Sequence, residues 1–315
     1  MPKLDNLLIC SIIFSFFIIT IPSCSYNNYQ KLHADIISSA TISDIRINEA
    51  SGIAVSRIHK DIVWIINDGG SSSAALIFGV NSKGEHLCTI DIQGVRNNDW
   101  EDIASFEYKG KPYILIADVG DNKAERTKYF LHVIQEPDLK KISHVSPVSI
   151  KPSWSMAFTY EDGPRDCESV AVDIINEKIL LLSKRDHPSV LYELSLQKQE
   201  KAVAKRLGQI KPLPQPTQND IRLMKYLNYI TQPTAMDISA DGLSAIVLTY
   251  ANAYYYNLEK KTGWLSAFST PPKEIVLPFL QQAESVCFGK DGTSIYVTSE
   301  ITPVPLLKID LTKFK

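Results

Sequence analysis

The sequence lacks most of the signatures by which common enzyme families are recognised. It has no Gly-x-Ser-x-Gly motif, which argues against a serine hydrolase built on a nucleophile elbow. It has no glycine-rich phosphate loop and no dinucleotide fingerprint. Its 6 histidines and 5 cysteines show no metal-ligand spacing, so a zinc site is not expected. The formal net charge is −2, and the sequence lacks the cluster of basic residues that is typical of nucleic-acid-binding proteins. A nucleic-acid partner is therefore not expected.

Long apolar runs are absent except near the N-terminus. The uncharged run from Leu7 to Ile21 follows Lys3 and is shorter than the roughly 20 apolar residues that cross a bilayer. It matches the apolar core of a secretory signal. The run ends at Ile21-Pro22-Ser23-Cys24, which resembles a bacterial lipoprotein processing site with Cys24 as the lipidated residue. Ordinary cleavage near this point and an uncleaved anchor are the alternatives, and all three predict an exported protein.

The leader and its processing site contain two of the cysteines. Cys88, Cys167 and Cys287 remain, an odd number without the pattern of a disulfide framework. We expect small buried side chains, and one disulfide among them stays an open alternative.

A recurring pattern indicates the fold of the rest of the chain. A polar and a small residue precede a short apolar stretch, a turn and a β-branched strand that ends in polar residues. Five copies of this pattern begin at Ser51, Glu101, Glu168, Thr234 and Glu284. Two of the turns contain the hairpin pair Asp-Gly, at Asp241 and Asp291. Each copy therefore predicts two antiparallel strands joined by a turn.

Further strand-like stretches follow the copies, for example 75–80 and 86–92 after the first. Four strands in a repeat of roughly 40 to 50 residues are typical of a propeller blade. Most second strands are apolar on both faces, as packing between two blades requires. We therefore predict an all-β fold, a single β-propeller of four-stranded antiparallel blades. Five blades are preferred, and six are the alternative.

A sixth blade would have to lie within 140–160 or 205–232. The second interval is rich in proline, and residues 220–229 predict a short helix instead. The chain then divides into a signal peptide with its processing site (1–24), an N-terminal segment that supplies a ring-closing strand (25–44) and the propeller (45–315). We expect a monomer in the cell envelope, lipid-anchored at the periplasmic face of a membrane, or a secreted protein.

The hairpins bring acidic residues to one face of the propeller. The start of each first strand and the end of each second strand lie at the same face. The acidic residues at these ends are Glu49, Asp68, Asp99, Glu101, Asp102, Asp118, Asp121, Asp166, Glu168, Asp186, Glu284 and Glu300. Lys184 and Arg185 are the basic residues in the second-strand ends. Converging carboxylates raise each other's pKa or require a cation, and Ca²⁺ accepts irregular oxygen sites. A single aspartate here often only caps a turn.

Several motifs resemble a known family. They are Ala50-Ser51-Gly52-Ile53-Ala54, Asn67-Asp68-Gly69-Gly70, Asp99-Trp100-Glu101-Asp102-Ile103-Ala104, Asp118-Val119-Gly120-Asp121-Asn122 and Glu168-Ser169-Val170-Ala171. Together they resemble the bacterial secreted propellers grouped as phytase-like or esterase-like, over about residues 45–300. The resemblance implies a propeller fold and hydrolysis of an ester or phosphate ester, and propeller phytases hold several Ca²⁺ ions through carboxylates. Thr234 stands where other copies have glutamate, and basic residues for a multiply phosphorylated substrate are sparse.

Two classes of function remain open. The first is metal-assisted hydrolysis of a phosphate ester or a carboxylic ester. In it, the predicted Ca²⁺ ligands are Asp99, Glu101, Asp102, Asp118 and Asp121, and the general base is Glu168 or Glu284. The predicted contacts to a small anionic substrate are Asp68, Lys184, Arg185 and Glu300. The second class is a non-catalytic propeller that binds a glycan, a peptide or an envelope protein. Its aromatic surface would come from Trp100, Tyr250 and the run Tyr254-Tyr255-Tyr256, unless that run belongs to a strand.

Overall fold

The computed structural model describes residues 30–70, 74–141, 147–214, 231–259 and 262–315. The predicted signal peptide with Cys24 and the predicted helix at 220–229 lie outside these residues. Strands dominate, and the helical elements are short: η1 (Leu139–Lys141), α2 (Trp264–Phe268) and η3 (Thr312–Phe314). Within the described ranges, no helix has the length and apolarity needed to cross a membrane.

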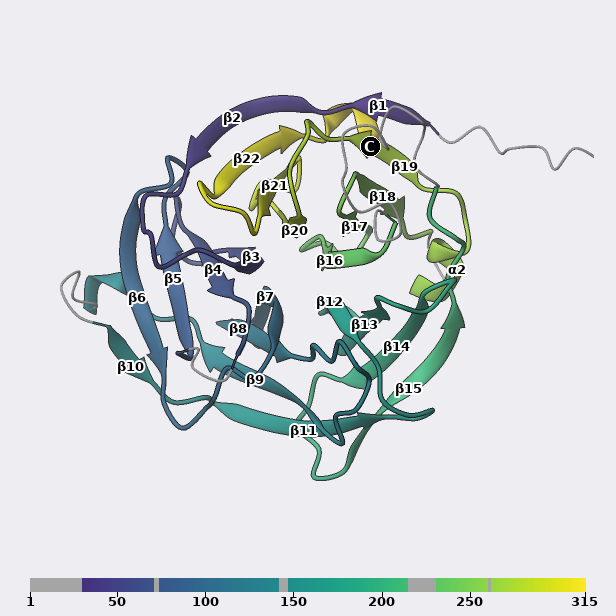
Figure 1. Ribbon diagram of the computed structural model, residues 1–315, viewed down its shortest axis with the longest axis horizontal. Coiled ribbons are helices and arrows are strands. Elements are labelled where there is room, and N and C mark those ends of the chain that lie inside the picture. The colour runs from purple at the N-terminus through teal and green to yellow at the C-terminus, as the bar shows by residue number, and fades with distance from the viewer. Residues whose placement is uncertain (1–29, 71–73, 142–146, 215–230, 260–261) are drawn as a thin grey trace, which may run out of the picture.

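An inner ring of strands surrounds a common axis (Figure 1). Its members are β3 (Ala50–Val55), β7 (Trp100–Tyr108), β12 (Cys167–Asp173), β16 (Pro233–Ile238) and β20 (Ala283–Phe288). Each strand contacts the next, and β20 contacts β3, so the ring of contacts is closed. The inner strands are buried over almost their whole length because neighbours cover both of their faces.

Each inner strand pairs antiparallel with the strand that follows it in sequence. These second strands are β4 (Val63–Asn67), β8 (Lys111–Asp118), β13 (Lys178–Ser183), β17 (Ser244–Thr249) and β21 (Ser294–Ser299). Their central residues are buried on both faces, as the apolar sequence of these strands predicts. For example, Trp64 and Ile66 of β4 share one apolar cluster with Ile103 and Ile114 of the neighbouring hairpin.

Each inner strand and its second strand begin a row of antiparallel strands, and the outer strands complete these rows. The third strands are β5 (Leu76–Val80), β9 (Tyr129–Gln135), β14 (Val190–Ser195), β18 (Ala253–Asn257) and β22 (Pro305–Asp310). The outermost are β6 (His86–Ile92), β11 (Trp154–Tyr160), β15 (Ala202–Gln209), β19 (Lys273–Val276) and β2 (Asp35–Thr41). Two short strands add parallel edges, β10 (Val148–Ile150) on β6 and β1 (Lys31–His33) on β19.

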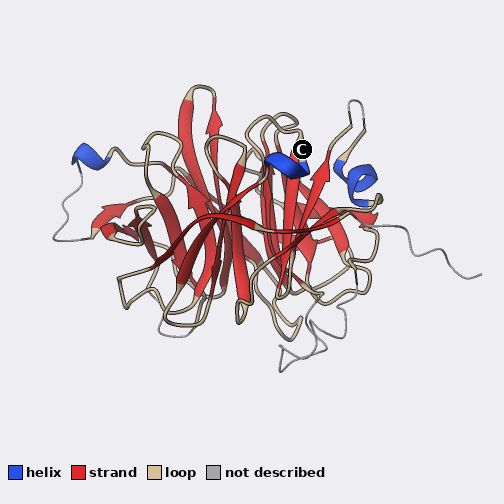
Figure 2. Ribbon diagram, turned by 90° about the horizontal axis from the view of Figure 1, so that it is seen from above, coloured by secondary structure: helices blue, strands red, loops and turns tan. Residues whose placement is uncertain are grey.

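Two pairings tie the rows together. The strands β11 and β15 pair in parallel, which joins two rows into one 8-stranded sheet. The strand β2 pairs antiparallel with β22, so the first and last parts of the described chain meet in one sheet. Seen from the side, the strands run between two faces that are formed by loops (Figure 2). This radial arrangement of antiparallel strands is that of a β-propeller.

Each inner strand contains a β-bulge at its start. The pairing with the second strand skips one residue in each case, namely Ser51, Glu101, Glu168, Thr234 and Glu284. A bulge inserts an extra residue, bends the strand locally and changes the direction of the side chain. The five bulged residues are those with which the five sequence copies begin. The copies found in the sequence therefore coincide with the register of the strands.

Candidate functional site

Six carboxylates lie close together where the inner strands begin. We call them the acidic ring: Asp68, Asp99, Glu101, Glu168, Glu284 and Glu300. The six groups interact electrostatically. Burial raises the pKa values of Asp68, Glu101 and Glu284, and the charge of Glu168 raises all three further. The hairpin topology thus brings the ends of several rows to one place, as the sequence predicts.

Three members of the ring form a possible cation site. Asp68 follows β4, Asp99 precedes β7, and Glu101 is the bulged residue of β7. One carboxylate oxygen from each lies within 4.8 Å of the other two. An oxygen-only set of this kind suits a hard cation such as Ca²⁺. We call these three residues the carboxylate trio.

Two glycines of the sequence motifs allow the trio to assemble. A Cβ atom on Gly120 would collide with Oε1 of Glu101 and Oδ2 of Asp99. A Cβ atom on Gly69 would collide with the backbone between Asn98 and Asp99. The glycines of the motifs Asn-Asp-Gly-Gly and Asp-Val-Gly-Asp-Asn are therefore explained by close approach to Asp99 and Glu101.

The trio is strongly disfavoured in its fully charged state. Glu101 is 5% exposed, and among the described residues its carboxylate has no hydrogen-bond or ion-pair partner. Burial raises its pKa well above the usual range, and the charges of Glu168, Asp68 and Asp99 add to this effect. Burial, together with the charge of Asp99, raises the pKa of Asp68 to about 8. A divalent cation at this position would reverse these shifts.

Two of the other three members of the ring, Glu168 and Glu300, have hydrogen-bond partners among the described residues. The Nζ atom of Lys184 donates hydrogen bonds to Glu168 and, at 2.9 Å, to the hydroxyl of Tyr250. Burial still raises the pKa of Glu168 to about 7, although the charge of Lys184 opposes that shift. Glu300 accepts a hydrogen bond from Gln282 Nε2 at 2.6 Å. Burial and the charges of Glu168 and Glu300 raise the pKa of Glu284 well above its usual range.

Asp102 lies outside the trio, although the sequence predicts it as a metal ligand. Its carboxylate accepts backbone hydrogen bonds from Ile103 at 2.9 Å, Val170 at 2.8 Å and Met236 at 3.3 Å. It therefore connects β7 to β12 and β16 inside the ring. The hydrogen bonds of Asp102 to three backbone N–H groups separate it from Glu101, which is the bulged residue of β7.

Asp118 and Asp121 also lie outside the trio. Asp118 is fully buried, forms an ion pair of 2.6 Å with Arg126 and accepts a hydrogen bond from Asn98 at 2.6 Å. Asp121 accepts hydrogen bonds from the hydroxyl of Tyr129 at 2.7 Å and from the backbone of the following turn. Both carboxylates are used in local structure. Asp68, which the sequence assigns to substrate, takes their place beside Asp99 and Glu101.

The predicted substrate-binding cations are already paired. Lys184 contacts Glu168, and Nε of Arg185 lies 2.5 Å from Asp166. A third pair joins Arg165 to Asp186 at 3.1 Å. Because Arg126 and Arg165 lie in loops, sequence position alone could not assign them to Asp118 and Asp186.

The aromatic residues of the binding hypothesis do not form a surface. Trp100 is 0% exposed, and each tyrosine of the run Tyr254-Tyr255-Tyr256 is 2% exposed. The run belongs to β18, as the strand interpretation of its sequence predicts. Tyr250 alone is half-buried, and its hydroxyl contacts Lys184.

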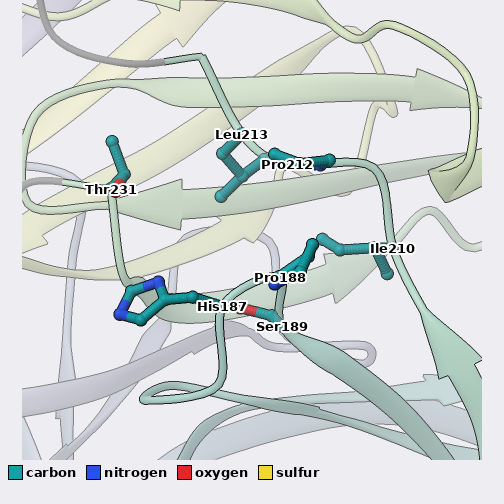
Figure 3. Close-up of a pocket in the computed structure, with 7 residues that line it drawn as sticks. All are labelled: His187, Pro188, Ser189, Ile210, Pro212, Leu213 and Thr231. Atoms are coloured by element: carbon teal, nitrogen blue, oxygen red, sulfur yellow. The ribbon is translucent and has the colours of Figure 1, made fainter.

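Two further features contain none of the predicted site residues. A cavity of about 280 Å³ is lined by His187, Pro188, Ser189, Ile210, Pro212, Leu213 and Thr231 (Figure 3). No acidic residue is among the described residues that line it. Cys88, Cys167 and Cys287 are free and buried, which confirms the expectation of small buried side chains.

Comparisons with known proteins support the fold class. No protein-family model matches the chain, and no curated protein matches it. Among solved structures, the chain is similar to the major allergen Mala s 1 of Malassezia sympodialis, with a TM-score of 0.53 and 11% identity. That match covers 88% of this chain and 97% of the allergen. A gluconolactonase of Xanthomonas campestris is also similar, with a TM-score of 0.45, 11% identity and coverage of 82% of this chain and 72% of that chain.

At this level of identity, the likeness shows the fold alone. The class is therefore an all-β propeller, as the sequence predicts. The comparisons do not distinguish the phytase-like family from other propellers, so that finer resemblance stays a proposal.

Proposed function

We propose that this protein is a propeller whose carboxylate trio binds Ca²⁺ and that it hydrolyses a phosphate ester or a carboxylic ester there. The observation that supports the proposal is the geometry of Asp68, Asp99 and Glu101, whose oxygens lie within 4.8 Å of one another. Glu101 adds weight because it is buried without a partner among the described residues. A buried carboxylate of this kind is costly unless it is protonated or bound to a cation.

Calcium fits the donor set better than zinc does. The trio offers only carboxylate oxygens, whereas zinc sites are usually built from cysteine and histidine. Ca²⁺ takes six to eight oxygens in irregular geometry, so three carboxylates leave positions for water and substrate. A bound Ca²⁺ would polarise the substrate oxygen and lower the pKa of a water molecule.

Glu168 is better suited than Glu284 to act as the general base. Its pKa of about 7 leaves a substantial unprotonated fraction near neutral pH, where a general base is most effective. Glu284 has a pKa well above the usual range and is therefore protonated over more of the working range. Lys184 keeps Glu168 in place, and Arg185 is engaged with Asp166. Attraction for an anionic substrate would thus come mainly from the cation.

We also propose five blades for the propeller. The closed ring of inner strands, each followed by three antiparallel partners, supports this count. The preference for five over six was already present in the five sequence copies. An experimental electron-density or cryo-microscopy map would decide the count directly, and a sixth row of strands at residues 215–230 would contradict it.

Export and lipidation at Cys24 complete the proposal. The apolar run before Cys24 supports it. Metabolic labelling with palmitate in a bacterial host should label the wild-type chain and leave Cys24→Ser unlabelled. A wild-type chain that stays unlabelled but is secreted would instead indicate ordinary signal cleavage.

Hydrolysis is tested with the chain that lacks residues 1–24. Aryl phosphates, an aryl phosphodiester and aryl carboxylic esters are offered with Ca²⁺, after chelation, and after Ca²⁺ is restored. We expect turnover that disappears on chelation and returns with the metal, and loss of turnover in Glu168→Gln. Turnover that survives chelation would contradict the proposed mechanism. Ca²⁺ binding without any turnover would favour the non-catalytic class.

A further inference from the structure

The inner strands have one edge without a partner strand. Each of the five is the last strand at one end of its sheet, so only its outer edge takes part in a β-ladder. The other edge faces the axis of the propeller (Figure 1). Buried backbone N–H groups on that edge need acceptors other than a neighbouring strand. Side chains of other inner strands can supply such acceptors.

Asp102 supplies acceptors to three backbone N–H groups. Its Oδ1 atom accepts a hydrogen bond at 2.9 Å from Ile103, on its own strand. Its Oδ2 atom accepts one at 2.8 Å from Val170 of β12 and one at 3.3 Å from Met236 of β16. The side chain is buried. One carboxylate therefore links three of the five inner strands.

These contacts need acceptor oxygens and not a negative charge. Burial raises the pKa of Asp102 well above its usual range, and the hydrogen bonds from Val170, Ile103 and Met236 lower it. A protonated carboxyl group still has a carbonyl oxygen, which can accept hydrogen bonds from both Val170 and Met236. The link is thus compatible with either protonation state.

Among the described residues, Asp102 is the one side chain that hydrogen-bonds β12 to another inner strand. Three other contacts between inner strands are made by hydroxyl groups, namely Ser51 to the carbonyl of Trp100, Thr234 to that of Ala283 and Ser285 to that of Ala50. On β12, Ser169 follows the bulged residue as Ser285 does on β20. The hydroxyl of Ser169 is buried and has no such partner. The place of β12 beside β7 therefore depends on Asp102 more than on any other polar side chain.

The two strands carry different parts of the proposed site. Glu101, directly before Asp102, is the bulged residue of β7 and a member of the trio. Glu168, two residues before Val170, is the bulged residue of β12 and the proposed general base. The other members of the trio lie after β4 and before β7, so the trio contains no residue of β12. Loss of the link would leave the cation ligands in place and displace the base.

We propose that Asp102 is a positioning residue that fixes the general base Glu168 relative to the cation ligand Glu101. This inference rests on the proposed function and adds the residue that aligns the two parts of the site. Asp102 need not touch the substrate or the ion for this role. A displacement of about 1 Å between reacting groups can reduce a rate by roughly 100-fold.

Asp237 provides a matched control. Its Oδ1 atom accepts a hydrogen bond at 2.8 Å from Ile238, on its own strand, and its Oδ2 atom accepts one at 2.8 Å from Phe288 of β20. It is buried in an inner strand, as Asp102 is. The strands that it links, β16 and β20, carry neither the trio nor Glu168.

The experiment compares Asp102→Ala, Asp102→Asn and Asp237→Ala in the chain that lacks residues 1–24. In Asp102→Ala, kcat for an aryl ester substrate should fall roughly 100-fold, whereas the Ca²⁺ affinity measured by calorimetry should change little. Asp102→Asn should lose less, because its amide oxygen can replace Oδ2. Asp237→Ala should retain both kcat and Ca²⁺ affinity. Equal kcat values in Asp102→Ala and Asp237→Ala would overturn the inference, and so would parallel losses of kcat and Ca²⁺ affinity in Asp102→Ala.

Amide hydrogen exchange tests the link without any need for turnover. In Asp102→Ala, exchange should become faster at Val170 and stay unchanged at Phe288, and Asp237→Ala should show the reverse. If Asp102→Ala does not fold, the wild type decides, because rapid exchange at Val170 would overturn the inference. A wild type that shows this link but hydrolyses none of the substrates would instead overturn the proposed function, so the two failures are distinguishable.

Discussion

The carboxylates at the face of the propeller where the inner strands begin fall into two neighbouring regions. In one, Asp118, Asp166 and Asp186 each face an arginine at 2.5 to 3.1 Å. In the other, Asp68, Asp99 and Glu101 converge, and none of them forms an ion pair among the described residues. Backbone hydrogen bonds join the regions, since the N–H groups of Val119 and Gly120 donate to the carbonyl of Asp99. The difference identifies the trio as the candidate cation site by its missing counter-ions and not by the number of acidic residues.

The largest expected effect on folding is in the region where each carboxylate is paired with an arginine. Asp118→Asn leaves Arg126 without its counter-ion, so the free energy of unfolding should fall by about 1–3 kcal/mol. The cation affinity of the trio should change little, because Asp118 is not one of its ligands. Chemical denaturation measures the first quantity and calorimetry the second. Loss of Ca²⁺ binding in a folded Asp118→Asn protein would contradict the separation of the two regions.

A smaller effect is expected where the two regions meet. Gly120→Ala places a Cβ atom against the carboxylates of Asp99 and Glu101, so these groups must shift. Ca²⁺ affinity should fall by roughly tenfold, as it does when the positions of metal ligands are disturbed. Gly263→Ala is the matched control, because nothing lies within 4 Å of the atom that it adds. Equal Ca²⁺ affinities in the two variants would show that Gly120 does not position the trio.

The smallest effect is a dependence of stability on pH. The folded pKa values of Asp68 and Glu168 are about 8 and about 7, whereas these groups titrate near 4 in an unfolded chain. Between those limits, the folded metal-free protein binds protons that the unfolded chain has released. Its stability should therefore be greatest below about pH 4, as far as these groups are concerned, and should fall as the pH rises toward 8.

Added Ca²⁺ should compensate for this loss at high pH. Melting temperatures with a chelator and with Ca²⁺ should differ by several degrees near pH 8 and by little near pH 5, where protons compete with the ion. A stabilisation by Ca²⁺ that is equal at both pH values would indicate that the raised pKa values do not belong to the cation site.

Much of the fold could be predicted because the relevant signals are local. The second strands are apolar on both faces, and the hairpin turns are short, so the repeats could be aligned by eye. The alignment of the copies also placed Ser51 and Thr234 at the position of the three glutamates, and all five residues that begin the copies are bulged. The position of each acidic residue at a strand end then followed from topology.

The composition of the site could be predicted only in part, because side-chain direction and loop conformation decide it. Asp68 was predicted at this face as a contact to substrate, and the structure places it beside Asp99 and Glu101. Asp102 was assigned to the metal, although its carboxylate binds backbone N–H groups of β12 and β16. The contact between Arg126 and Asp118 depends on a loop whose path the sequence pattern does not specify.

The most direct test of the account is calorimetric titration with Ca²⁺ of the wild type and of Glu101→Gln. The wild type should bind the ion, and the substitution should weaken binding by roughly 100-fold or more, because it removes a ligand and not merely a neighbour of one. Metal-free Glu101→Gln should also melt at a higher temperature than the wild type, because a buried carboxylate without a partner has been replaced by a neutral amide. Equal Ca²⁺ affinities in the two proteins would contradict the central claim.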